Sequence, residues 1–116
     1  MNININNYIH YQGKYIIYEE KGIGKEYDSN SNTDKLIFEG QYLNGIRNGK
    51  GIEYYYDKIL YEGEYLNGKR QGKGKEYNKN NKIIFEGEYL NDNKWNGNYM
   101  EYSDYIGKLI YEGEYL

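Results

Sequence analysis

The sequence predicts an all-β fold, a single-layer, twisted antiparallel sheet of successive β-hairpins that forms an open repeat array. Two observations predict it. Short phrases that alternate aromatic with polar residues return about every 24 residues, and Asn-Gly pairs follow several of them, as in hairpin turns. No segment shows the apolar period of a helix. At 116 residues, we expect a single domain over 1–116.

The first recurring phrase places a glycine between two aromatic residues. It reads Phe-Glu-Gly-Gln-Tyr-Leu from Phe38 and Tyr-Glu-Gly-Glu-Tyr-Leu from Tyr61, and the chain stops after the copy that begins at Tyr111. The copy from Tyr11 is degenerate. The central glycines are Gly13, Gly40, Gly63, Gly87 and Gly113.

A second phrase, Gly-x-Gly-x-Glu-Tyr, begins nine residues after the central glycine, and in the fourth copy it slips by one residue. Each pair of phrases predicts the two strands of one hairpin. The predicted repeats cover about 11–27, 38–56, 61–77 and 85–102, with a partial repeat at 111–116. The polar turn-formers of 28–35 predict an inserted loop.

Both phrases resemble the MORN repeat, whose pattern is roughly Tyr-Glu-Gly-Glu-aromatic, a short Asn-Gly-Lys loop and then Gly-x-Gly. The chain departs from that pattern in the missing His before Gly-x-Gly, in Tyr where Trp is usual, and in the altered fourth copy at 91–96. The resemblance implies a trough built of hairpins. It also links the trough and the hairpin tips to protein partners and to phospholipid headgroups.

The pairing register decides which residues share a face. A two-residue turn at Asn67-Gly68 with regular pairing would put Tyr61 and Tyr77 on opposite faces, whereas a five-residue loop over 67–71 puts them together. The second register separates apolar from polar residues better, so we predict it. Tyr61 and Tyr65 should then be more buried than Glu62 and Glu64, and the same should hold in the next repeat.

Nothing in the sequence indicates catalysis, a cofactor or a metal site, so we expect no enzyme. The only histidine, His10, has no Cys, Asp or Glu close in sequence, and we interpret it as a surface strand residue. Paired carboxylates such as Glu62 and Glu64 recur once per hairpin and therefore indicate a solvated acidic row rather than one tuned site. Ser29 and Ser31 lie in turn-like sequence.

The aromatic face is the predicted binding site, because a single-layer sheet has no second layer to cover it. We expect it to hold a protein, a peptide or a second copy of the chain, unless the rings fill the trough themselves. Its predicted residues are Phe38, Tyr42, Tyr54, Tyr61, Tyr65, Tyr77, Phe85, Tyr89 and Tyr102.

A second hypothesis is a peripheral membrane module that binds anionic headgroups weakly through basic hairpin tips. The candidate contacts are Arg47, Lys69, Arg70 and Lys94. The net charge of −3 with interleaved Glu and Lys argues against nucleic acid. The absence of Cys, of a signal-peptide pattern and of a long apolar run leads us to expect a cytoplasmic protein. The last strand, 111–116, lacks a hairpin partner, so a homodimer through this edge is a further expectation.

Overall fold

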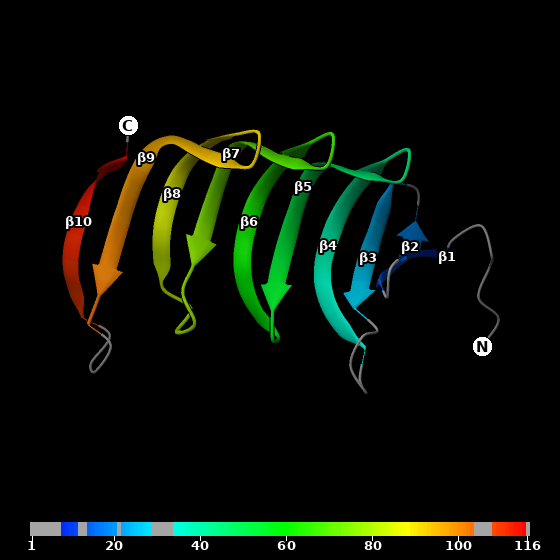
Figure 1. Ribbon diagram of the computed structural model, residues 1–116, viewed down its shortest axis with the longest axis horizontal. Helices are drawn as coiled ribbons and strands as arrows, with labels where there is room; N and C mark the ends of the chain where they lie inside the picture. Colours follow the sequence, from blue (N-terminus) through cyan, green and yellow to red (C-terminus); the bar gives the residue numbers. More distant parts are fainter. Residues whose placement is uncertain (1–7, 12–13, 21, 29–33, 104–107, 116) are drawn as a thin grey trace.

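A computed structural model describes residues 8–11, 14–20, 22–28, 34–103 and 108–115. In this part of the chain, ten strands form one antiparallel sheet in which each strand pairs with its sequence neighbours (Figure 1). The predicted fold class is thus confirmed. The strands are β1 (Tyr8–Tyr11), β2 (Lys14–Glu20), β3 (Ile23–Asp28), β4 (Lys35–Leu43), β5 (Ile46–Tyr55), β6 (Lys58–Leu66), β7 (Lys69–Tyr77), β8 (Ile83–Leu90), β9 (Asn93–Tyr102) and β10 (Leu109–Tyr115).

The inserted loop is shorter than the predicted 28–35. Asp28 ends β3 and Lys35 begins β4, and the two pair with each other across the sheet. Residues 29–33 lie outside the described part of the chain. The two ends of the polar segment therefore belong to the sheet, because the pairing continues to the last residue of β3 and the first residue of β4.

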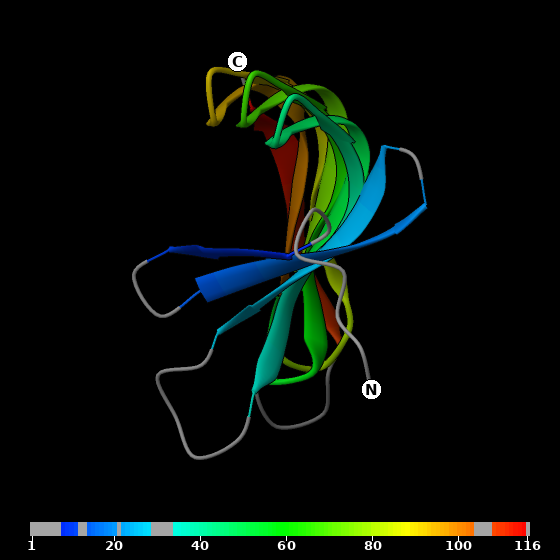
Figure 2. The ribbon, with the colours of Figure 1, turned by 90° about the vertical axis from the view of Figure 1, so that its right-hand side faces the viewer.

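Two-residue turns join β4 to β5, β6 to β7 and β8 to β9, all at the same end of the hairpins. Asn67 and Gly68 have φ values of 52° and 86°, and Asn44 with Gly45 and Asn91 with Asp92 repeat this pattern. Both residues of a type I′ turn need positive φ, which Asn, Asp and Gly tolerate best. Viewed along the array, these three tips lie one behind another, while β1 and β2 run across the direction of the later strands (Figure 2).

The predicted five-residue loop is wrong, and so is the register that it implied. After the Asn67-Gly68 turn, Tyr65 pairs with Arg70, but Gly63 then pairs with Gly74. Two extra residues of β7 are therefore accommodated opposite Glu64, in a β-bulge where Gly72 has a φ of 87°. The two extra residues keep the alternation of side chains along β7, so Tyr77 lies on the face opposite Tyr61.

Three tyrosines lie on the face opposite to the predicted one. Tyr77 donates its hydroxyl to Glu62, and Tyr54 donates to Glu39, so both lie on the glutamate face. Tyr102 stands three residues from Tyr99, which packs against the core, and therefore also lies on the opposite face.

The other six predicted aromatic residues form the core of the described chain. Their side chains are 0–7% exposed. The four glutamates beside them in β6 and β8 are half-buried or exposed, which confirms the predicted difference in burial. The six residues are Phe38, Tyr42, Tyr61, Tyr65, Phe85 and Tyr89.

Glycine pairs let these rings lie against the sheet. A Cβ atom added to Gly74 would stand 2.5 Å from the ring and the hydroxyl of Tyr61, and one added to Gly63 would stand 2.6 Å from the Cα of Gly74. Such separations are too short for a real Cβ atom. The ring of Tyr61 therefore occupies the space that a side chain at Gly74 would need.

We expect Gly74→Ala to lower the free energy of unfolding by about 1–3 kcal/mol, the usual cost of overpacking a core. The neighbouring change Lys73→Ala should stay within about 0.5 kcal/mol of the native chain because Lys73 is exposed. Urea denaturation of both variants measures the difference. Equal stability of the two would contradict the role given to the glycine pair.

Candidate partner-binding site

The six buried rings, with one further ring at each end, form a continuous ladder along the array. Neighbouring rings meet edge to face, with centroids 5.1–5.9 Å apart and planes inclined by 82–87°. This geometry places the positive edge of one ring against the negative face of the next. In spatial order the ladder is Tyr18, Tyr42, Phe38, Tyr65, Tyr61, Tyr89, Phe85 and Tyr115. The trough is thus filled by the protein's own side chains.

Cations cover the ladder from outside. The guanidinium carbon of Arg47 lies 4.1 Å from the ring centroid of Phe38, and that of Arg70 lies 4.2 Å from Tyr61. The Lys94 ammonium takes the same place 5.1 Å from Phe85. These contacts are cation–π stacks on the aromatic face. Three of the four predicted headgroup contacts therefore belong to the core covering, and the fourth, Lys69, is exposed at a tip.

Glutamates of the second phrase bridge these cations. Glu53 pairs with Arg47 at 3.1 Å and with Arg70, and Glu76 pairs with Arg70 at 3.2 Å and with Lys94 at 3.8 Å. Burial lowers the pKa of Arg70, but the charge and hydrogen bond of Glu53 outweigh it, and the net shift is upward. Both guanidinium groups remain charged and are fully engaged inside the fold.

The tyrosine hydroxyls join the same network. Tyr42 donates to Glu26 at 2.8 Å, and Tyr89 donates to Glu76 at 2.7 Å. Burial first, and the neighbouring carboxylate second, raise the pKa of Tyr89 well above its usual value. Burial also raises the pKa of Tyr61 to about 12. The buried Tyr65 hydroxyl has no hydrogen-bond partner among the described residues.

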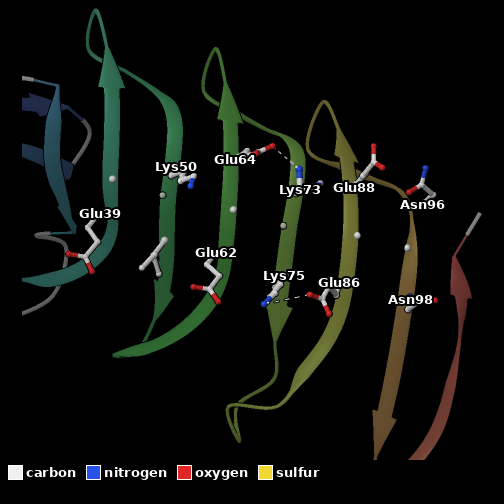
Figure 3. Close-up of a pocket in the computed structure, with 17 residues that line it drawn as sticks. Glu39, Lys50, Glu62, Glu64, Lys73, Lys75, Glu86, Glu88, Asn96 and Asn98 are labelled. Carbon is white, nitrogen blue, oxygen red and sulfur yellow. Dashed lines mark hydrogen bonds and ion pairs between the residues drawn. The ribbon is translucent and has the colours of Figure 1, made fainter.

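The opposite face carries a groove of about 1000 Å³ that runs across β4 to β9 (Figure 3). Central glycines line it, and two rows of polar side chains stand along it. In Figure 3, Glu64, Lys73 and Glu88 stand nearer the hairpin tips than Glu62, Lys75 and Glu86 do. The lining side chains are Glu39, Lys50, Ile52, Glu62, Glu64, Lys73, Lys75, Glu86, Glu88, Asn96 and Asn98.

Several of these groups are held in place. Glu64 accepts a hydrogen bond from the backbone N–H of Lys73 at 2.9 Å and so caps the bulge, while Lys75 pairs with Glu86 at 3.5 Å. Burial and the bond to Glu62 raise the pKa of Tyr77 to about 12, so this hydroxyl keeps its proton at neutral pH. Five carboxylates against three ammonium groups leave the groove net negative. It can therefore offer both charge signs to a partner, with an acidic excess.

Sequence reasoning missed the groove. It interpreted the recurring glutamates as a solvated row, although the bulge glycines Gly49 and Gly72 signal a change of register. His10 lies in β1, as predicted, and its side chain lies outside the described part of the structure. The described residues hold no cluster of three or more potential metal ligands and no helix long and apolar enough to cross a membrane.

An open sheet of stacked hairpins with a self-filled core and one grooved face defines the chain as a β-hairpin repeat protein. The family model of the MORN repeat matches residues 38–58 and 61–82, so this part of the chain consists of two adjacent MORN repeats. MORN repeats are generally associated with protein or membrane interactions, and the family is generally non-catalytic. A comparison with curated proteins found no match.

We expect Arg70→Ala to destabilise the fold by about 2–3 kcal/mol, somewhat less than the loss of a fully buried pair because the side chain is 17% exposed. The change leaves Glu53 and Glu76 without their shared cation and uncovers Tyr61. Lys69→Ala, one residue away, should change stability by less than about 0.5 kcal/mol. Thermal and urea unfolding compare the pair. A similar loss in both variants would contradict the buried role of Arg70.

Stability should also decline at alkaline pH. Neutral tyrosines that keep a raised pKa in the fold stabilise it fully below about pH 10, the unfolded value, and this contribution is lost as the pH rises towards the folded pKa. The reason is that the unfolded chain then releases protons that the fold retains. Urea titrations from neutral pH upward, with tyrosinate absorbance followed in parallel, measure the slope. Tyr89→Phe should make that slope shallower.

Proposed function

We propose that the chain is a non-enzymatic interaction module that holds a protein or peptide partner in the groove opposite the aromatic ladder. The observation that carries the proposal is the difference between the two faces of the sheet, since one forms the core and the other carries an open groove. The six central rings are buried in the core, with 0–7% of each side chain exposed, and the cations cover them. The groove, in contrast, is accessible and lined by half-buried or exposed polar groups.

The length of the groove suits a peptide segment. It crosses six strands, and five strand spacings amount to about 24 Å. That distance equals about seven residues of extended chain or about 16 residues of helix. A partner segment of this size could bridge most of the repeats and contact both charge signs.

An anionic membrane surface is a weaker candidate. Arg47, Arg70 and Lys94 each pair with a glutamate and cover a ring, so they are not presented as a basic patch. The groove itself has an acidic excess. Binding to anionic vesicles should accordingly be weak and largely abolished at about 0.5 M salt, where screening is nearly complete.

Selection from a random peptide library tests the proposal. Peptides selected on the native chain should shift the backbone NMR signals of groove residues, and the double variant Glu62→Ala, Lys75→Ala should weaken binding at least about tenfold, or 1.4 kcal/mol. Tyr55→Ala, an exposed residue of β5 at the other end of the hairpins, is the matched control. Binding that maps to the loops, or tight salt-resistant binding to vesicles, would overturn the proposal.

A further inference from the structure

A row of exposed apolar side chains borders the groove on the side of the hairpin tips. We call it the leucine rim, and it consists of Leu43, Ile46, Leu66 and Leu90, which are 58%, 50%, 51% and 41% exposed. The three leucines occupy the same place in successive hairpins, directly before each two-residue turn. Ile46 pairs with Leu43 across its turn, and its methyl group lies against the next tip, at Gly68.

The rim belongs to the groove face. Side chains alternate along a strand, and Leu66 stands two residues beyond Glu64 and four beyond Glu62, both of which line the groove. Leu43 likewise stands four residues beyond Glu39, and Leu90 stands two residues beyond Glu88, so both also lie on the groove face. One face thus presents a central polar groove and, along its edge, a row of exposed apolar side chains of the kind that marks interaction surfaces.

The spacing of the rim matches a helix that lies across the strands. Leu43, Leu66 and Leu90 are each two strands apart, or about 10 Å. Seven residues of α-helix rise about 10.5 Å, and a helix with apolar residues at positions a and d presents one every 3.5 residues on average. Positions a of such a helix would meet the leucines, and the d position between the first two would meet Ile46.

The charges of the groove specify the flank of that helix. The acidic excess lies in the row farther from the tips, where Glu39, Glu62 and Glu86 stand with Lys75, so a basic flank that reaches this row is favoured over an acidic one. Lys69 interrupts the rim between Leu66 and Leu90, where it pairs with Leu66 across the turn. The helix position that faces Lys69 would therefore be polar or acidic rather than apolar.

We propose that the partner segment is an amphipathic α-helix that lies along the tip side of the groove, with its a and d residues on the leucine rim and its basic flank over the glutamates. This inference rests on the proposed function and specifies its partner. It distinguishes a helix from an extended peptide, which would take its contacts from the glycine-lined centre of the groove.

Designed peptides of about three heptads, which span about 31 Å as a helix, test the inference. The probe has Leu at a and d, except for Glu at the d position that faces Lys69, and Lys on the flank. One control peptide replaces two central residues by Pro, which breaks the helix, and another carries Glu on the flank. Trp95, the only tryptophan, is 57% exposed and adjoins Asn96 of the groove lining, so its fluorescence reports binding.

The Lys-flanked peptide should bind, gain helical circular dichroism on binding, and exceed both control peptides in affinity by at least about tenfold. The triple variant Leu43→Asn, Leu66→Asn, Leu90→Asn should lose that affinity while its urea midpoint stays unchanged, since all three side chains are exposed. Tyr55→Asn, exposed to 65% away from the rim, should bind like the native chain.

Two results would overturn the inference that the partner segment is a helix and leave the proposed function of the groove intact. One is equal or better binding of the Pro-containing peptide. The other is full affinity of the triple leucine variant for a peptide that still shifts the NMR signals of the groove residues. Failure of the Lys-flanked peptide to bind would likewise overturn the inference, and the library selection would then decide separately whether the groove binds peptides.

Discussion

The structure depends on one repeated stack, in which a glycine pair, an aromatic ring and a cation lie on top of one another. A single-layer sheet has no second layer of backbone to cover its apolar face, and rings on a flat exposed sheet would remain half in water. Here Gly63 and Gly74 let the Tyr61 ring approach the backbone, and Arg70 closes it from above. Repetition of this unit turns a row of hairpins into a fold with a dry core.

The fold and the core could be predicted because they depend on local, repeated signals. Asn67-Gly68 specifies a tight turn, and Tyr61 and Tyr65 flank a glycine at a spacing that places both on one face. The register could not be predicted from alternation alone, because a bulge in β7 opposite Glu64 shifts the pairing by two residues between Tyr65 and Gly63. The two-residue turn places Tyr77 on the face opposite Tyr61, where its hydroxyl donates to the groove residue Glu62.

The candidate site was less predictable for a related reason. Arg70 appears in the sequence as a charged residue next to a turn, which normally indicates exposure, and only the pairing with Tyr65 reveals that it covers the core. The glutamates of the first phrase appear as a solvated row, and the groove between them depends on the shape of the whole sheet. The sequence shows Leu66 as an apolar exception on a polar face. Only the structure shows that Leu43 and Leu90 align with it to form a row.

The sharing of carboxylates between hairpins has a consequence for how the array holds together. Glu53 belongs to one repeat and serves the arginines of two, and Glu76 does the same for Arg70 and Lys94. In these described hairpins the charges are completed only by the neighbouring repeat, so a cut between two of them would leave a carboxylate without one of its cations. Nearest-neighbour coupling of this kind makes the repeats of a linear array fold and unfold together instead of independently.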